Sequence, residues 1–281
     1  MADDHMADDP MADDPMADDH MTTPPARPPL QSPQDDRLWA ELRRMTAARI
    51  GLQRTGASLA TGPQLDFQLA HARARDAVHE PLDEARLIAG LAELGGPVVA
   101  VASAAGDRQR FLMRPDLGRR LAPGAEAALA PHEGRYDIVF VITSGLSARA
   151  VQAHTQPLLA FLLPTLRAEQ WRIAPLVIVR HGRVAVGDAI ATALGADCVA
   201  VVIGERPGLS APDSMGAYLT WQPHAHTTDA DRNCISNIRP EGIGYTDAAF
   251  KLAHMLRAIR ARRMSGVQLK DDSDRRLLGE Q

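Results

Sequence analysis

The chain has few cysteines, few aromatic residues and no long apolar segment, and each shortage excludes a class of protein. Two cysteines among 281 residues cannot build the disulfide framework of a small secreted domain, so we expect a reducing, cytoplasmic setting. The most apolar run, 157–166, is shorter than the ~20 residues of a membrane-spanning helix. Aromatic residues make up 4% of the chain, too few for a nucleic-acid stacking platform. We therefore expect neither a membrane nor a nucleic acid as partner.

The standard catalytic motifs are also missing. There is no G-x-x-x-x-G-K-[ST] loop and no G-x-S-x-G turn, and the chain has only two lysines, Lys251 and Lys270. The nearest match to a dinucleotide fingerprint, residues 242–244, follows a loop and lacks its third glycine. His224 and His226 could offer two imidazoles to a metal, but no third ligand follows at metal-site spacing. We expect no metal site in this chain.

What the chain does contain is enough apolar sequence for a folded core, with 45% hydrophobic and 23% charged residues. Its net charge of −4 conceals an asymmetry, because the repeated MADDH/MADDP start carries most of the acidic excess. That start has little to bury, so we expect it to be disordered. The expected division is 1–36 as a disordered acidic and Pro-rich tail, 37–64 as a helical segment and linker, 65–135 as a region of helices and short strands, and 136–281 as an α/β core.

Apolar spacing predicts the secondary structure along the chain. Expected helices are 38–50, 65–80, one around Leu87, Ile88, Leu91 and Leu94, 147–166 despite two prolines, 186–194 and 246–263. Expected strands are 97–103, 108–114, 136–143, 175–179, 198–203 and 218–221. Near-continuous β-branched runs joined by helices are typical of a parallel sheet buried on both faces. We therefore predict an α/β fold with a doubly wound, mostly parallel, Rossmann-like sheet and N-terminal helices.

In such sheets the ligand lies beyond the carboxyl ends of the strands, where the loops converge. Three loops rich in glycine and polar residues follow predicted strands, at 144–147, 180–184 and 204–210. Each could equally be an ordinary turn. The segment 231–240 lacks periodicity and is crowded with polar groups, which is typical of a functional loop. Cys234 within it has no Cys-His signature, so we expect a small thiol or a ligand contact, and we expect Cys198 in the core.

Seven motifs, taken in order, resemble those of one enzyme family. They are RARDAV (73–78), RPDLGRRL (114–121), GLSARAV (145–151), GRVAVGD (182–188), GERPGLS (204–210), RNCISNIRPEG (232–242) and SGVQLK (265–270). Together they are similar to the small (light) subunit of ethanolamine ammonia-lyase, from about residue 65 to residue 270.

The resemblance implies an adenosylcobalamin-dependent lyase that converts ethanolamine to acetaldehyde and ammonia by a radical mechanism. It implies a large, barrel-forming subunit as partner, with six large and six small chains in a heterododecamer, and a small chain that is not catalytic alone. Carried over by motif, the family's cobalamin contacts on this chain fall on Val184, Glu205 and Cys234. Glu205 could instead be a surface partner of Arg206, and Val184 could be loop packing.

Some features differ from the family or from related proteins. The D-x-H-x-x-G motif that supplies a cobalt ligand in many cobalamin domains is missing, since residues 76–79 have the wrong spacing. We expect a base-on cofactor that keeps its own dimethylbenzimidazole on the metal. Ser144 stands where the family often has Asp before GLSA, which leaves a polar contact there in doubt. In some bacteria the family is sent to a microcompartment by an amphipathic N-terminal extension, but this polar, acidic start does not support encapsulation.

Two other functions are compatible with the fold class. One is a nucleotide-dependent α/β enzyme that acts alone. The other is a non-enzymatic binding module, for example a regulator that uses its basic last helix on nucleic acid.

Overall fold

A computed structural model describes residues 33–273, and its contacts divide the chain into two units, Met1–Ala60 and Thr61–Gln281. In the first unit, helix α1 (Pro33–Met45) is followed by a hairpin of β1 (Arg54–Thr55) and β2 (Ser58–Leu59). Helix α1 begins and ends five residues before the expected 38–50, since Pro33 is compatible with a first helical turn. The expected disordered tail falls outside the described residues up to residue 32, whereas 33–36 are helical. The four-part domain division stays a prediction.

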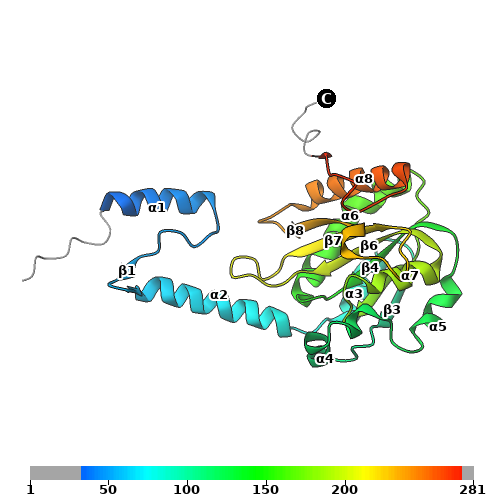
Figure 1. Ribbon diagram of the computed structural model, residues 1–281, viewed down its shortest axis with the longest axis horizontal. Helices are drawn as coiled ribbons and strands as arrows, with labels where there is room; N and C mark the ends of the chain where they lie inside the picture. Colours follow the sequence, from blue (N-terminus) through cyan, green and yellow to red (C-terminus); the bar gives the residue numbers. More distant parts are fainter. Residues whose placement is uncertain (1–32, 274–281) are drawn as a thin grey trace, which may run out of the picture. The chain divides into compact units, whose positions relative to one another are not determined.

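The second unit contains a six-stranded mixed sheet in the order β3-β5-β4-β6-β7-β8 (Figure 1). The strands are β3 (Val98–Ala102), β4 (Tyr136–Thr143), β5 (Leu176–Arg180), β6 (Ala196–Gly204), β7 (Met215–Trp221) and β8 (Arg232–Ile238). The first four in this order are parallel, whereas β7 is antiparallel to both β6 and β8. The α/β class is confirmed. The finer description, doubly wound and Rossmann-like, stays a prediction.

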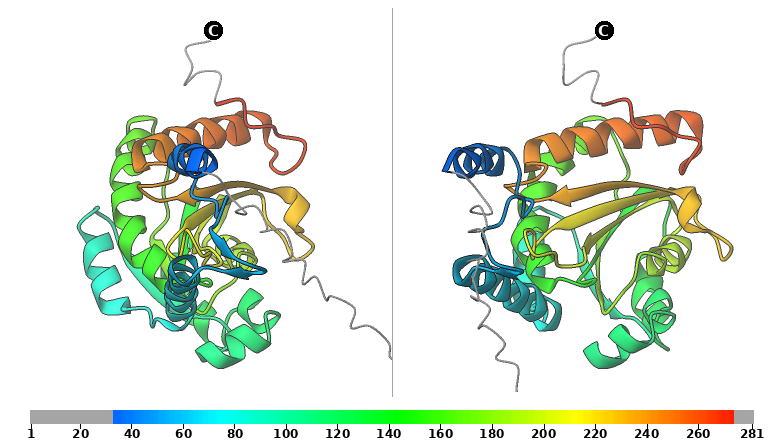
Figure 2. Two further views of the ribbon diagram at one scale, coloured as in Figure 1. Left: turned by 90° about the vertical axis from the view of Figure 1, so that its left-hand side faces the viewer. Right: turned by 60° about the vertical axis from the view of Figure 1, so that its left-hand side comes forward.

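Helices pack on both faces of the sheet (Figure 2). The helices of this unit are α2 (Thr61–His79), α3 (Glu84–Ala92), α4 (Arg108–Met113), α5 (Ala125–Leu129), α6 (Ala148–Ala168), α7 (Val186–Leu194) and α8 (Tyr245–Arg262), with short 3-10 turns η1 (Leu117–Arg119), η2 (Ala130–His132) and η3 (Asp229–Asp231). Side chains of α3, α6 and α8 form one core with the sheet, and those of α5 and α7 form the other. Cys198 is fully buried in the first core, as expected. None of the helices in 33–273 is both long and apolar enough to cross a membrane.

Two expected elements are wrong. Residues 108–114 were expected as a strand, but 108–113 form helix α4. Asp107 caps this helix by accepting a hydrogen bond from the Arg110 backbone N–H (2.8 Å). Residues 231–240, expected as a loop, contain the edge strand β8. Its apolar Ile235 and Ile238 face the core under α8, while exposed polar side chains along the strand hide its period from a sequence reading.

Candidate functional site

The candidate site lies at the carboxyl edge of the parallel strands, where the loops after β4, β5 and β6 meet. The loops are joined by backbone and hydroxyl hydrogen bonds, since Leu146 N–H donates to Gly204 O (2.9 Å) and Gly182 N–H donates to Thr143 Oγ1 (2.9 Å). Gly145 has φ +51°, and an added Cβ would lie 2.3 Å from the Gly204 carbonyl oxygen. Only glycine therefore allows the first and third loops to approach this closely.

A cavity of about 520 Å³ opens among these loops, and it brings two of the expected contacts together. Val184 and Glu205 both line it. Its other lining residues are Pro115, Arg119, Gly145, Leu146, Arg183, Ala185, Ile203, Gly204, Arg206, Ser214, Tyr218 and Asp229. The residues of the predicted loops thus share one cavity, although Gly145 and Arg206 are 61 positions apart in the chain.

Glu205 connects the loop after β6 to the edge strand. Its carboxylate accepts a hydrogen bond from the Ser236 hydroxyl and another from the Asn237 backbone N–H (3.1 Å). The Glu205 side chain is therefore held on β8. These contacts pair Glu205 with Ser236 and Asn237 instead of with Arg206. Each carboxylate oxygen has two lone pairs, so Glu205 keeps acceptor capacity for a ligand.

Cys234 is exposed and lies on β8 directly opposite Tyr218 of β7. Tyr218 lines the cavity, so Cys234 adjoins it through this cross-strand neighbour. Although the residue as a whole is exposed, desolvation raises the pKa of the Cys234 thiol; a hydrogen bond with Tyr218 opposes this effect and the negative charge of Glu205 adds to it. The thiol is therefore protonated at neutral pH, which suits a neutral contact and not a nucleophile.

Val184 is half-buried and stands at the turn that leads into α7. Its side chain packs against the second core, and its carbonyl accepts a hydrogen bond from the Gly187 backbone N–H (3.1 Å). Val184 thus takes part in loop packing, which was the alternative to a cofactor contact. Val184 also contributes an apolar surface to the cavity, next to Arg183.

Sequence reasoning missed the basic side of the cavity. The Arg183 guanidinium lies 4.2 Å from the centre of the Phe111 ring, and its backbone N–H donates to Gly118 O (2.7 Å). Burial lowers the pKa of Arg183, and the nearby positive charge of Arg119 lowers it further. No motif marks these arginines in a chain with so many, because only the fold shows which ones reach the cavity.

A buried ion pair, also missed, lies beside the cavity. Arg232 at the start of β8 donates from Nη1 to Asp188 Oδ1 (2.8 Å) and from Nη2 to Asp188 Oδ2 (2.6 Å), in a bidentate arrangement. Arg232 Nη1 also donates to Thr220 Oγ1 (3.0 Å). Asp188 is on α7, so the pair joins that helix to the edge strand.

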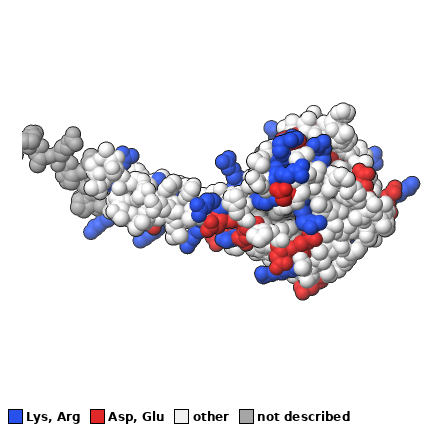
Figure 3. Space-filling model, turned by 90° about the horizontal axis from the view of Figure 1, so that it is seen from below, with Lys and Arg blue, Asp and Glu red and all other residues white. Residues whose placement is uncertain are grey.

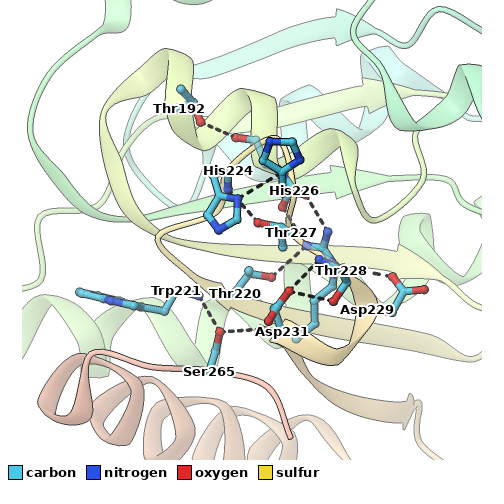
Figure 4. Close-up of polar contacts among 12 residues, drawn as sticks. Thr192, Thr220, Trp221, His224, His226, Thr227, Thr228, Asp229, Asp231 and Ser265 are labelled. Carbon is cyan, nitrogen blue, oxygen red and sulfur yellow. Dashed lines mark hydrogen bonds and ion pairs between the residues drawn. The ribbon is translucent and has the colours of Figure 1, made fainter. Parts of the chain in front are cut away.

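Polar side chains fill the turn between β7 and β8, beyond this ion pair (Figure 4). The His226 backbone N–H donates to His224 Nδ1 (3.1 Å), so the first imidazole stabilises the turn. Within the described residues no group of three or more His, Cys, Asp or Glu could hold a metal ion. A second cavity, of about 770 Å³, lies between this turn and α7 and shares Arg119 and Ala185 with the first.

Charges of both signs are mixed on the face of the molecule in Figure 3. Lys and Arg side chains lie among Asp and Glu side chains there, so this face does not offer the continuous basic surface that binds nucleic-acid phosphates. On this face the basic side chains are thus interspersed with acidic ones.

Comparisons with known proteins agree on one family. A family model described as ethanolamine ammonia-lyase light chain (EutC) matches residues 36–270. Three curated relatives named ethanolamine ammonia-lyase small subunit are similar to the chain. They are from Azotobacter vinelandii strain DJ (52% identical, covering 87% of this chain and 92% of the relative), Pseudomonas fluorescens strain SBW25 (50%, 88% and 90%) and Ralstonia nicotianae strain GMI1000 (52%, 85% and 90%).

Proposed function

Because this chain belongs to the ethanolamine ammonia-lyase light chain family, we propose that it is the small subunit of an adenosylcobalamin-dependent ethanolamine ammonia-lyase. The enzyme would convert ethanolamine to acetaldehyde and ammonia. The chain would supply one side of the corrinoid site, and a large catalytic subunit would supply the other. The supporting observation is that Val184 and Glu205 line one cavity, with Cys234 beside it.

The residues that line the cavity suit a corrinoid in their chemistry. A corrinoid rim carries amide side chains, which both donate and accept hydrogen bonds. Glu205 offers an acceptor to amide N–H groups, while Arg119 and Arg183 offer donors to amide carbonyls. Cavities of ~300–1,000 Å³ enclose drug-sized ligands. A corrinoid is larger than that, so it would project from the cavity of about 520 Å³ and leave a face for a second subunit.

When bound, adenosylcobalamin supplies the radical chemistry through cleavage of its cobalt–carbon bond. The chain's own residues bind and orient. Glu205, held on β8 by Ser236 and Asn237, presents a fixed acceptor, and Val184 presents an apolar surface next to it. The protonated Cys234 thiol makes a neutral contact. As part of the proposal, no histidine of this chain binds cobalt, and the cofactor stays base-on.

The proposal is tested by co-expression with a large subunit of the family. We expect the two chains to elute together in size-exclusion chromatography and to deaminate ethanolamine only with adenosylcobalamin present. The mass of that complex would measure the proposed stoichiometry of six and six. Nucleotide binding by the isolated chain would favour the stand-alone enzyme, and salt-sensitive retention on DNA would favour the binding module.

The site itself is tested by Glu205→Ala. Loss of the carboxylate removes an acceptor for the cofactor and the connection to β8, so we expect the apparent Kd for adenosylcobalamin to rise about tenfold while the subunits still assemble. The Kd of Glu205→Gln, which keeps one acceptor oxygen, should lie between those of the wild type and Glu205→Ala. The matched control is Glu93→Gln, whose carboxylate binds Gln156 Nε2 (2.9 Å) on α6 instead. An unchanged Kd in Glu205→Ala would remove this residue from the site.

A further inference from the structure

The ion pair between Asp188 and Arg232 is among the most buried charged contacts of the described chain. The Arg232 side chain is 2% exposed and that of Asp188 is 11% exposed. Both oxygens of the carboxylate and both terminal nitrogens of the guanidinium take part, with Thr220 Oγ1 as a further acceptor. Such two-point contacts fix the relative orientation of the groups as well as their distance.

The pair connects the two chain segments that carry proposed cofactor contacts. Asp188 follows Val184 by four residues, about one helical turn, on α7. Arg232 precedes Cys234 by two residues on β8, so the two side chains point to the same face of the sheet. Asp188 itself lines the second cavity. Any shift between the two elements would therefore change the spacing between Val184 and Cys234.

Strand β8 has particular need of this connection. It is the last strand of the sheet, and its pairing with β7 has a register irregularity between Met215 and Ala217. Helix α8 packs against its inner face through Ile235 and Ile238. On the other face α7 packs over β4 and β6, and the Arg232 side chain passes the end of β7 at Thr220 to reach it.

We propose that Asp188 and Arg232 are positioning residues that set the separation of the α7 turn and the edge strand at the cofactor cavity. This inference rests on the proposed function, because the separation of the two elements affects cofactor binding only if the chain binds the corrinoid in this cavity. Neither side chain need touch the cofactor. They act by holding Val184 and Cys234 at a fixed spacing, so the cavity is already shaped before the ligand arrives.

The test uses the complete complex with the large subunit and adenosylcobalamin as the titrated ligand. Asp188→Asn and Arg232→Lys each break the bidentate contact, and we expect each to raise the apparent Kd about tenfold, the size typical when a supporting partner of a binding residue is lost. Thr220→Val removes only one acceptor and should raise the Kd by less.

A matched control separates positioning from plain stability. Asp137→Asn breaks the pair of Asp137 with Arg172 (2.6 Å), at the edge of the sheet opposite the loops. It should lower Tm without changing the Kd. If Asp188→Asn and Arg232→Lys lower Tm but leave the Kd unchanged, the pair only stabilises the fold and the proposal is overturned. If Asp188→Asn does not fold, the Kd values of Arg232→Lys and Thr220→Val decide between positioning and stability. A wild-type complex that assembles but binds no adenosylcobalamin would instead reject the proposed function, and this inference with it.

Discussion

His154 on α6 is a buried histidine that the proposed site does not use. It is 4% exposed, its Nδ1 lies 2.8 Å from the Tyr245 hydroxyl, and its Nε2 lies 3.9 Å from Asp213 Oδ2. Burial lowers the pKa of His154, although the Asp213 carboxylate opposes that effect and Arg239 adds to it. The charged imidazolium is thus less stable in the folded protein than in water.

The sign of the resulting pH dependence follows from linkage. Because the pKa of His154 is lower in the folded than in the unfolded chain, its neutral form contributes stability that is present above pH 6.5 and is lost as the pH falls through the folded pKa. We expect His154→Gln to flatten the fall in unfolding free energy below pH 6.5, measured by urea denaturation. His71→Gln on the exposed face of α2 is the control and should keep the wild-type profile. Identical profiles for wild type and His154→Gln would contradict this assignment.

At the scale of elements, the sequence predicted the buried strands well. Strands β4, β5 and β6 and helices α7 and α8 lie within two residues of their expected bounds, because runs such as 136–143 are apolar on both faces. Helix α6 continues through Pro157 and Pro164. The carbonyls freed by these prolines belong to Ala153 and Ala160, which are exposed and can bind water, so the helix tolerates both.

The elements that sequence could not predict are those shaped by distant neighbours. The α4 segment has one buried apolar side chain, Phe111, so its helix depends on the cap at Asp107 and not on periodicity. Along β8 the exposed residues Cys234, Ser236 and Asn237 do not alternate regularly with buried ones, so the strand lacks the period of two that predicts a strand from sequence. Of the site, the three loops were located from the sheet rule, whereas the ion pair of Asp188 and Arg232 needed the fold.

The packing of α7 on the sheet gives a prediction at this scale. Gly187 faces β6, and an added Cβ would lie 2.5 Å from Val201 Cγ2, a stiff, fully buried side chain. Alanine favours a helix by up to ~1 kcal/mol, but overpacking costs ~1–3 kcal/mol. We expect Gly187→Ala to lower the unfolding free energy measured by chemical denaturation. Gly208→Ala, in a loop where an added Cβ would lie 3.8 Å from its nearest neighbour, should change it by less than ~0.5 kcal/mol. Equal stability of both variants would show that α7 can move away from the sheet.

At the scale of the whole molecule, the folded core belongs to the second unit. Every buried apolar residue of the described chain lies at Ala77 or beyond. The α1 helix and the β1–β2 hairpin form a unit of their own. Among the described residues, the core that carries the proposed site is therefore built from the second unit.

A chain that starts at Thr61 should test this independence. We expect it to keep the Tm of the second unit within about 2 °C, since no buried apolar residue of the described chain is removed and the free energy of unfolding should change by less than ~0.5 kcal/mol. In complex with the large subunit its Kd for adenosylcobalamin should equal that of the full chain. Differential scanning calorimetry and cofactor titration are the measurements. A large loss of affinity would mean that the first unit reaches the cofactor.

The segment after α8 has a consequence for how the protein is made. Asn233 on β8 accepts a hydrogen bond from the Gly266 N–H (2.8 Å) and donates from Nδ2 to the Leu269 carbonyl (2.8 Å), so one of the last segments of the chain supports the strand that carries Cys234. During synthesis the N-terminal parts emerge and fold first. Strands β3 to β6 can pair before residues 266–269 have been made, whereas the edge beside Cys234 gains this support only afterwards. Association with the large subunit through this edge should therefore follow synthesis of residues 266–269.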